Sequence, residues 1–89
     1  MATSIRDLKK DINYVLGDII EAVYVWEYSN TDKDTIDSEA IIDEAIATFD
    51  ELIEKVNDKS VENRKTHLKS VNQELEDKGR ALIEKINKL

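Results

Sequence analysis

The chain has 89 residues, enough for one domain, and 20 Asp and Glu against 13 Lys and Arg give it a net charge of −7 at pH 7. The absence of cysteine excludes disulfides and thiolate zinc sites, and a lone histidine excludes a multi-histidine metal site within one chain. The acidic balance also leaves no electrostatic footprint for nucleic acid.

The composition favours long helices, because the chain has no proline and only two glycines to interrupt them. Residues 12–28 are the most apolar stretch, but Asp18, Glu21 and Glu27 within it exclude a membrane span. Residues 1–4 lead directly into a charged amphipathic pattern rather than a signal peptide. We therefore expect a cytoplasmic protein with no membrane partner.

The first helix is expected over residues 5–29. Ser4, with Asp7 three residues later, resembles a capping box at its start. The apolar residues that follow recur at alternating spacings of three and four, which predicts a core-facing helix and the most buried one of the chain. The predicted core positions are Ile5, Leu8, Ile12, Val15, Leu16, Ile19, Ile20, Ala22, Val23 and Trp26.

A loop is predicted over residues 30–35, which contain no apolar side chain. The second helix is expected over 36–57, with its N-cap between residues 34 and 37 and acidic residues in its first turns, where they suit the helix dipole. Its apolar stripe consists of Ile42, Ala45, Ile46, Phe49, Leu52, Ile53 and Val56.

A second break is predicted after Asn57, because Val61 is the only apolar residue between Asn57 and His67. The third helix is then expected over 60–88. The alternative is one continuous helix over residues 37–88, about 75 Å long, which could bury its stripe only in an oligomer. The stripe of the third helix consists of Leu68, Val71, Leu75, Leu82, Ile86 and Leu89.

Gly79 lies inside that stripe, where a large side chain is expected and where a glycine costs about 1 kcal/mol relative to alanine. In an up-down-up bundle it would lie near the level of Tyr24 and Trp26. We expect it to make room for a bulky ring; a ligand cleft or a hinge is the alternative.

The negative charge is concentrated in one part of the chain. Residues 27–58 carry a net charge of −9, whereas residues 59–72 carry +3. One interpretation is a solvated face that is partly neutralised within the fold, because Glu51 and Glu54 would lie near Arg64, Lys65 or Lys69. The other interpretation is a surface for a basic partner. The predicted acidic face of the second helix consists of Asp37, Glu39, Asp43, Glu44, Asp50, Glu51 and Glu54.

The first helix also carries apolar groups outside its core stripe. Three tyrosines fall on its otherwise polar side, although the whole chain has only five aromatic residues. Tyrosine is enriched at interfaces, and a glycine on the same side would let another helix approach closely. These residues either cover the ends of the bundle or form a self-association face, which consists of Tyr14, Gly17, Glu21, Tyr24, Val25 and Tyr28.

Catalytic and metal-binding patterns are incomplete. Residues 30–37 resemble an EF-hand loop, but the turn glycine is missing and Ala40 occupies the position of the terminal Glu. Arg64 precedes His67 by three residues, so no Glu-x-x-His pair exists, and we expect His67 to be exposed. Serines 4, 29, 38, 60 and 70 are expected at caps, in loops or at exposed helix positions. We therefore expect no enzyme, no catalytic residue, no metal and no cofactor.

Together these features predict an all-α fold with a single domain over 1–89, a three-helix up-down-up antiparallel bundle that self-associates through its first helix. The expected function is that of a small acidic, non-enzymatic protein acting by protein–protein interaction as a homodimer. The first alternative is an acidic inhibitor or immunity-type protein whose second helix binds a basic partner; the second is a weak metal-binding or enzymatic role.

Overall fold

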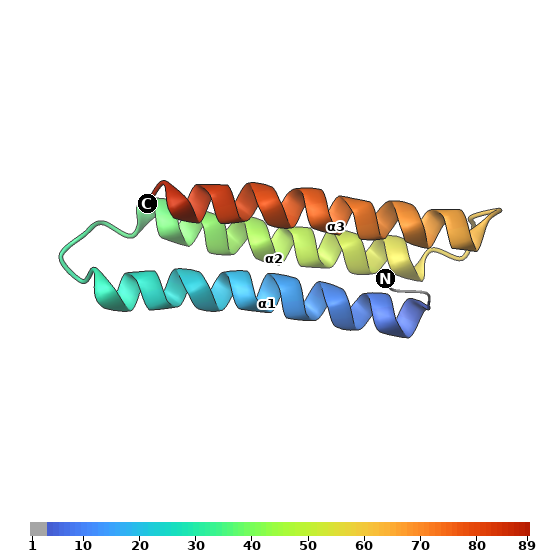
Figure 1. The fold of residues 1–89 in the computed structure, drawn as a ribbon, viewed down its shortest axis with the longest axis horizontal. Helices are drawn as coiled ribbons and strands as arrows, with labels where there is room; N and C mark the ends of the chain where they lie inside the picture. Colours follow the sequence, from blue (N-terminus) through green and yellow to red (C-terminus); the bar gives the residue numbers. More distant parts are fainter. Residues whose placement is uncertain (1–3) are drawn as a thin grey trace.

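The computed structural model describes residues 4–89, and it confirms an all-α chain of three helices packed against each other: α1 (Ile5–Ser29), α2 (Ile36–Asn57) and α3 (Arg64–Asn87). Residues 1–3, part of the segment considered as a leader, lie outside the described residues. Consecutive helices run in opposite directions, so that α1 and α3 are parallel to each other (Figure 1). The bundle measures 51 × 20 × 17 Å.

Polar side chains define both ends of α1. The Ser4 hydroxyl accepts a hydrogen bond from the Asp7 N–H at 3.1 Å, as the sequence predicts for an N-cap. At the other end the Asn30 amide donates to the Trp26 carbonyl at 2.8 Å and satisfies one of the last free carbonyls of the helix.

The break between α2 and α3 is present, which excludes the continuous helix, but α3 begins at Arg64 rather than near residue 60. Asp58 accepts hydrogen bonds from the N–H and the hydroxyl of Ser60, at 2.9 and 2.6 Å, and these bonds hold residues 58–60 in a turn. Asn63 then caps α3 by accepting from the Thr66 N–H at 3.1 Å.

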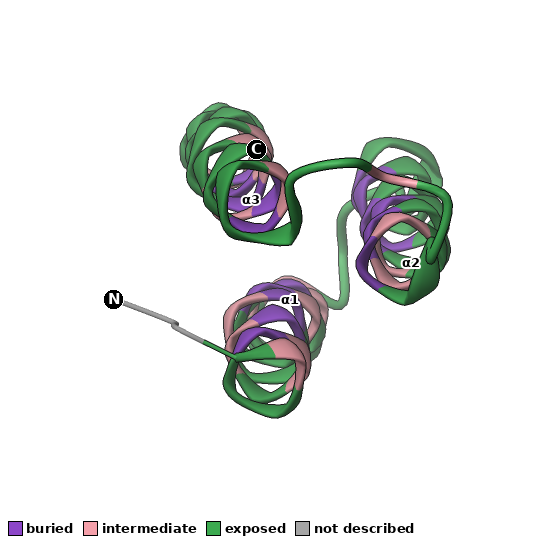
Figure 2. Cartoon of the chain, turned by 90° about the vertical axis from the view of Figure 1, so that its right-hand side faces the viewer, coloured by how far each residue is buried: buried purple, intermediate pink, exposed green. Residues whose placement is uncertain are grey.

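The core lies along the bundle axis, where the buried sides of the three helices face one another (Figure 2). Two predicted core residues, Ala22 and Ile46, are exposed instead, because the centre of each buried stripe is rotated toward neighbours such as Val23 and Ile41. The helix with most buried residues is α2, with seven against five in α1, which corrects the expectation for α1. The apolar core consists of Leu8, Ile12, Leu16, Ile19, Val23, Ile41, Ile42, Ala45, Leu52, Val56, Leu68, Val71, Leu75 and Leu82.

Two polar residues of α2 are buried with this core. Ser38, expected to be exposed or at a cap, is fully buried, and its hydroxyl donates to the Glu27 carboxylate at 2.6 Å. Thr48 donates its hydroxyl proton to the Glu44 carbonyl at 2.8 Å. No buried side-chain polar atom among residues 4–89 lacks a partner, so burial leaves no unmade hydrogen bond there.

Gly79 packs against α1 at a different level from the one expected. A Cβ at Gly79 would lie 3.2 Å from Cγ1 of Val15 and 3.9 Å from Cδ1 of Ile19, rather than beside Tyr24 and Trp26. The later start of α3, which extends past the first turn of α1, accounts for the offset (Figure 1). The glycine therefore makes room for an aliphatic side chain and not for a ring.

The two glycines should respond differently to alanine. Gly17→Ala should raise the free energy of unfolding by up to about 1 kcal/mol, because alanine is the better helix former and nothing lies within 4 Å of the new methyl group. Gly79→Ala should raise the free energy of unfolding by less, because the new methyl group would lie only 3.2 Å from Cγ1 of Val15. Val15 would have to move, and its β-branched side chain is stiff.

Urea denaturation in dilute solution measures both changes. Repeating Gly79→Ala in a Val15→Ala background is the control, and the full gain from alanine should return there. Equal stabilisation by the two single substitutions would contradict the assigned crowding.

Candidate functional site

The outer face of α1 is defined by the six predicted residues Tyr14, Gly17, Glu21, Tyr24, Val25 and Tyr28, and all six are exposed. The exposed fraction is 89% for Tyr28, 61% for Tyr14, 58% for Val25 and 53% for Tyr24. This face lies opposite the buried side of α1, which points toward α2 and α3 (Figure 2). More than half of each of the three tyrosines is therefore exposed to solvent.

Gly17 stands in the middle of this outer face with open space around it. No atom of the described chain outside its own helix backbone lies within 4 Å of the position of a Cβ, and its φ is not positive. Neither close packing within the chain nor an unusual backbone conformation requires a glycine there. It nevertheless costs the helix about 1 kcal/mol relative to alanine.

The acidic face of α2 is exposed at all seven predicted positions, and α3 neutralises one edge of it. Glu44 pairs with Lys85, and Glu51 pairs with Lys78 at 2.9 Å. The expected pairing of Glu51 and Glu54 with Arg64, Lys65 or Lys69 is wrong, because the late start of α3 places those three cations nearer the end of the bundle.

The other five carboxylates of this face form no ion pair within residues 4–89. They lie on the outward side and on the first turns of α2, and they are Asp37, Glu39, Asp43, Asp50 and Glu54. Within residues 4–89, ion pairs therefore neutralise the acidic face only along the edge that meets α3.

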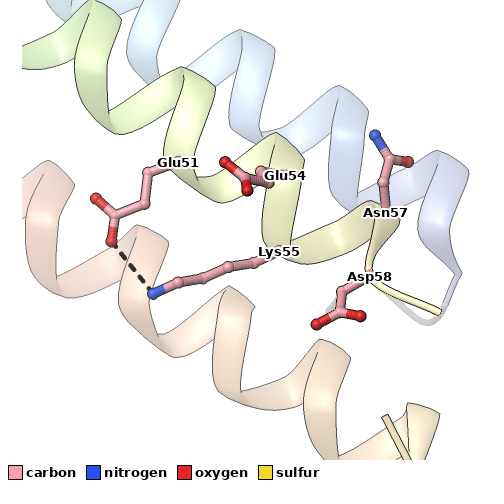
Figure 3. Close-up of a pocket in the computed structure, with 5 residues that line it drawn as sticks. All are labelled: Glu51, Glu54, Lys55, Asn57 and Asp58. Atoms are coloured by element: carbon pink, nitrogen blue, oxygen red, sulfur yellow. Dashed lines mark ion pairs between the residues drawn. The ribbon is translucent and has the colours of Figure 1, made fainter. Parts of the chain in front are cut away.

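Lys55 is the centre of the α2–α3 ion pairs. Its ammonium lies 2.7 Å from the Glu74 carboxylate. It also lies 3.2 Å from the Glu51 carboxylate, the pair that the dashed line marks in Figure 3. The hydrogen bond to Glu74, followed by that to Glu51, raises the pKa of Lys55. Hydrogen bonds from Lys78 and then from Lys55 lower the pKa of Glu51. All four groups are partly exposed, so solvent screens these pairs and they contribute little individually.

His67 has a structural contact that the sequence did not predict. It is half-buried rather than exposed, and its Nε2 lies 2.6 Å from the Lys55 carbonyl oxygen. The ring thereby satisfies a carbonyl in the last turn of α2. Asp58 stands nearby, and hydrogen bonds from the Ser60 hydroxyl and N–H lower the pKa of its carboxyl group.

The ionisable groups of the described chain all lie at least partly exposed to solvent. No Asp, Glu, Lys, Arg or His in residues 4–89 is buried, so none has the dry surroundings that adjust a catalytic group. No three acidic or histidine side chains in that span lie where they could hold a metal ion. In the loop that resembles an EF-hand, Asp34 accepts from the Ile36 N–H at 2.9 Å.

Within the part of the chain described, no helix combines the length and the apolar character that crossing a bilayer requires. Three exposed isoleucines outside the predicted face, Ile36, Ile46 and Ile83, are scattered over α2 and α3. Comparisons with models of protein families, with curated protein sequences and with solved structures found no match.

Removing the Lys78 cation should raise the pKa of Glu51 toward its ordinary value, because Lys78 contributes most to lowering it. The lowered pKa means that ionised Glu51 stabilises the fold at neutral pH, and that this contribution disappears as the pH falls through the lowered value. The difference in stability between the wild type and Lys78→Met should therefore shrink on acidification.

NMR titration of the Glu51 side-chain carboxyl carbon measures the shift directly. Lys65→Met makes the same charge change on the same helix at a residue in no ion pair within residues 4–89, and it should leave Glu51 as it is. An unchanged Glu51 titration in Lys78→Met would refute the assignment.

Proposed function

We propose that this protein is a non-enzymatic interaction protein that works as a homodimer through the outer face of α1. The observation that supports this proposal most is the position of Gly17 on the exposed side of α1, among three exposed tyrosines. No neighbouring atom lies within 4 Å of the position that a Cβ at Gly17 would occupy. A second helix crossing at Gly17 would use the space that a side chain would block. Such a contact offsets the cost of a glycine in mid-helix, which no contact within the described chain explains.

A second copy of the chain suits this face. The dimer with twofold symmetry is the commonest oligomer, and its interface uses the same patch on both subunits. Tyrosine rings provide apolar area, and their hydroxyls stay hydrogen-bonded to water or to polar groups of the partner. The solvated state of the ionisable side chains supports binding rather than catalysis as the mode of action.

Substitutions at the crossing point should weaken dimerisation. Tyr24→Glu places a charge in the interface and should abolish the dimer at micromolar concentration, whereas Gly17→Ala should weaken it by blocking close approach. Light scattering coupled to size exclusion measures the mass over a range of protein concentrations.

Ile36→Glu is the matched control, because it adds the same charge at an exposed apolar residue on α2 and should leave the dimer intact. A wild-type mass of one chain at every concentration would contradict the proposed dimer. A dimer that survives both α1 substitutions would contradict the proposed face.

The unpaired carboxylates of α2 favour a second candidate function, that of an acidic inhibitor or immunity-type protein that covers a basic partner. The α3 lysines leave one side of the acidic face free, and surface charge of one sign accelerates association with a partner of the opposite sign. The chemistry of that partner would be a patch of lysine and arginine side chains.

Reversing charges on the free side of α2 should remove binding to a basic surface. A variant with Glu39→Lys, Asp43→Lys and Asp50→Lys should lose salt-sensitive retention on a column bearing lysine-rich peptide. A variant with Glu76→Lys, Asp77→Lys and Glu84→Lys makes the same charge change on α3 and should keep most of it. Equal loss in both variants would show that only net charge matters.

A further inference from the structure

Five of the six residues of the outer face of α1, all except Val25, belong to a longer seam of residues spaced alternately by three and four. Every member is exposed, and the seam lies opposite the buried side of the helix. Spacings of three and four place residues in one line along a helix, which is the arrangement of a seam between two helices. The seam consists of Asp7, Lys10, Tyr14, Gly17, Glu21, Tyr24 and Tyr28.

The charges along this seam distinguish the two directions in which a second α1 could lie. In a parallel pair each residue meets its own copy, so Lys10 would face Lys10 and Glu21 would face Glu21. Like charges opposite one another weaken an interface, and arrangements of this kind exclude wrong pairings. An antiparallel pair about Gly17 brings together residues of different chemistry.

We infer that the second copy lies antiparallel on α1 and crosses it at Gly17, with Tyr14 opposite the partner's Glu21 and Lys10 opposite the partner's Tyr24. This inference rests on the proposed homodimer and adds its direction and register. Each subunit thereby contributes the acidic residue or the ring that completes the other subunit's half of the interface.

The register follows from distances along the helix. Tyr14 lies three residues before Gly17 and Glu21 four residues after it, so in an antiparallel pair both stand about 5 Å from the crossing point on the same side. Lys10 and Tyr24 each lie seven residues from Gly17, about 10 Å from the crossing. Each residue therefore stands at the same distance from the crossing point as the residue it pairs with on the partner, and the backbone of α1 does not have to change.

The chemistry of these two pairs is complementary. The Tyr14 hydroxyl can donate a hydrogen bond to the partner's Glu21 carboxylate, and bonds to a charged acceptor are the stronger kind. The Lys10 ammonium lies where it can contact the face of the partner's Tyr24 ring in a cation–π interaction. Twofold symmetry produces each pair twice.

Single cysteines test the direction, because the wild-type chain has none. Lys10→Cys and Tyr24→Cys chains are mixed under mild oxidation, above the concentration at which the wild type dimerises by light scattering. The mixture should form a crosslinked dimer that reductant reverses. Lys10→Cys alone should not, since antiparallel copies hold residue 10 about 20 Å apart and a disulfide needs Cα atoms within about 7 Å.

Ser70→Cys is the control for random collision, because it exposes a thiol on α3 away from α1 and should give no more crosslink than Lys10→Cys alone. Crosslinking of Lys10→Cys with itself would establish a parallel pair and overturn the inference. A wild type that is dimeric while no α1 cysteine crosslinks would also overturn it, whereas a wild type that is monomeric would show that the homodimer itself had failed.

A charge reversal gives a second measurement without cysteine. Lys10→Glu should weaken dimerisation at least fivefold in an antiparallel pair, because it replaces the cation over the partner's ring by a carboxylate near the partner's Glu21. In a parallel pair it exchanges one like-charge contact for another, so an unchanged dissociation constant would count against the antiparallel arrangement. Circular dichroism of the variant checks that the helices remain folded.

Discussion

The thinness of the bundle is the constraint on which the rest of the structure depends. With cross-sectional extents of 20 × 17 Å, each helix can bury only one side, and that side is occupied by leucine, isoleucine and valine. Burial of these side chains is the main stabilising term. None of the ionisable side chains of the described chain is buried in this core.

Polar contacts at the two ends of the bundle fix how the helices are placed along one another. The Glu27–Ser38 bond joins α1 to α2 beside the first loop, and the His67–Lys55 bond joins α3 to α2 beside the second. Both bonds are partly protected from water. A hydrogen bond that is protected from water is more costly to break than one at the surface. Ion pairs along the α2–α3 edge act in the same direction but are screened.

Periodicity in the sequence predicts the helices and most of the core because burial on one side of a helix imposes a spacing of three and four. The same pattern does not predict how far each helix is displaced along its neighbour. That displacement depends on Asp58, Ser60 and Asn63, whose hydrogen bonds delay the start of α3. As a result, Gly79 lies at the level of Val15 rather than at the expected level of Tyr24. For the same reason, Glu51 forms an ion pair with Lys78 rather than with one of the expected cations near the start of α3. Ser38 and His67 were missed because their partners lie 11 and 12 residues away, beyond the reach of local spacing.

The two glycines differ in their surroundings, and this difference is the basis of the proposal for the outer face of α1. Both lie inside long helices and destabilise them by a similar amount relative to alanine. The packing of the bundle explains Gly79, because Val15 occupies the space that a side chain there would take. Gly17 has no such neighbour, so the cost it imposes on the isolated chain is not offset by any contact in residues 4–89. Tyrosines flank it along the same seam, with Lys10 seven residues before it and Glu21 four residues after it. A second copy of α1 that runs antiparallel brings residues of different chemistry together on both sides of Gly17. In this proposal, the open space at Gly17 and the order of charges along the seam are two independent arguments for a second copy of the chain as the partner.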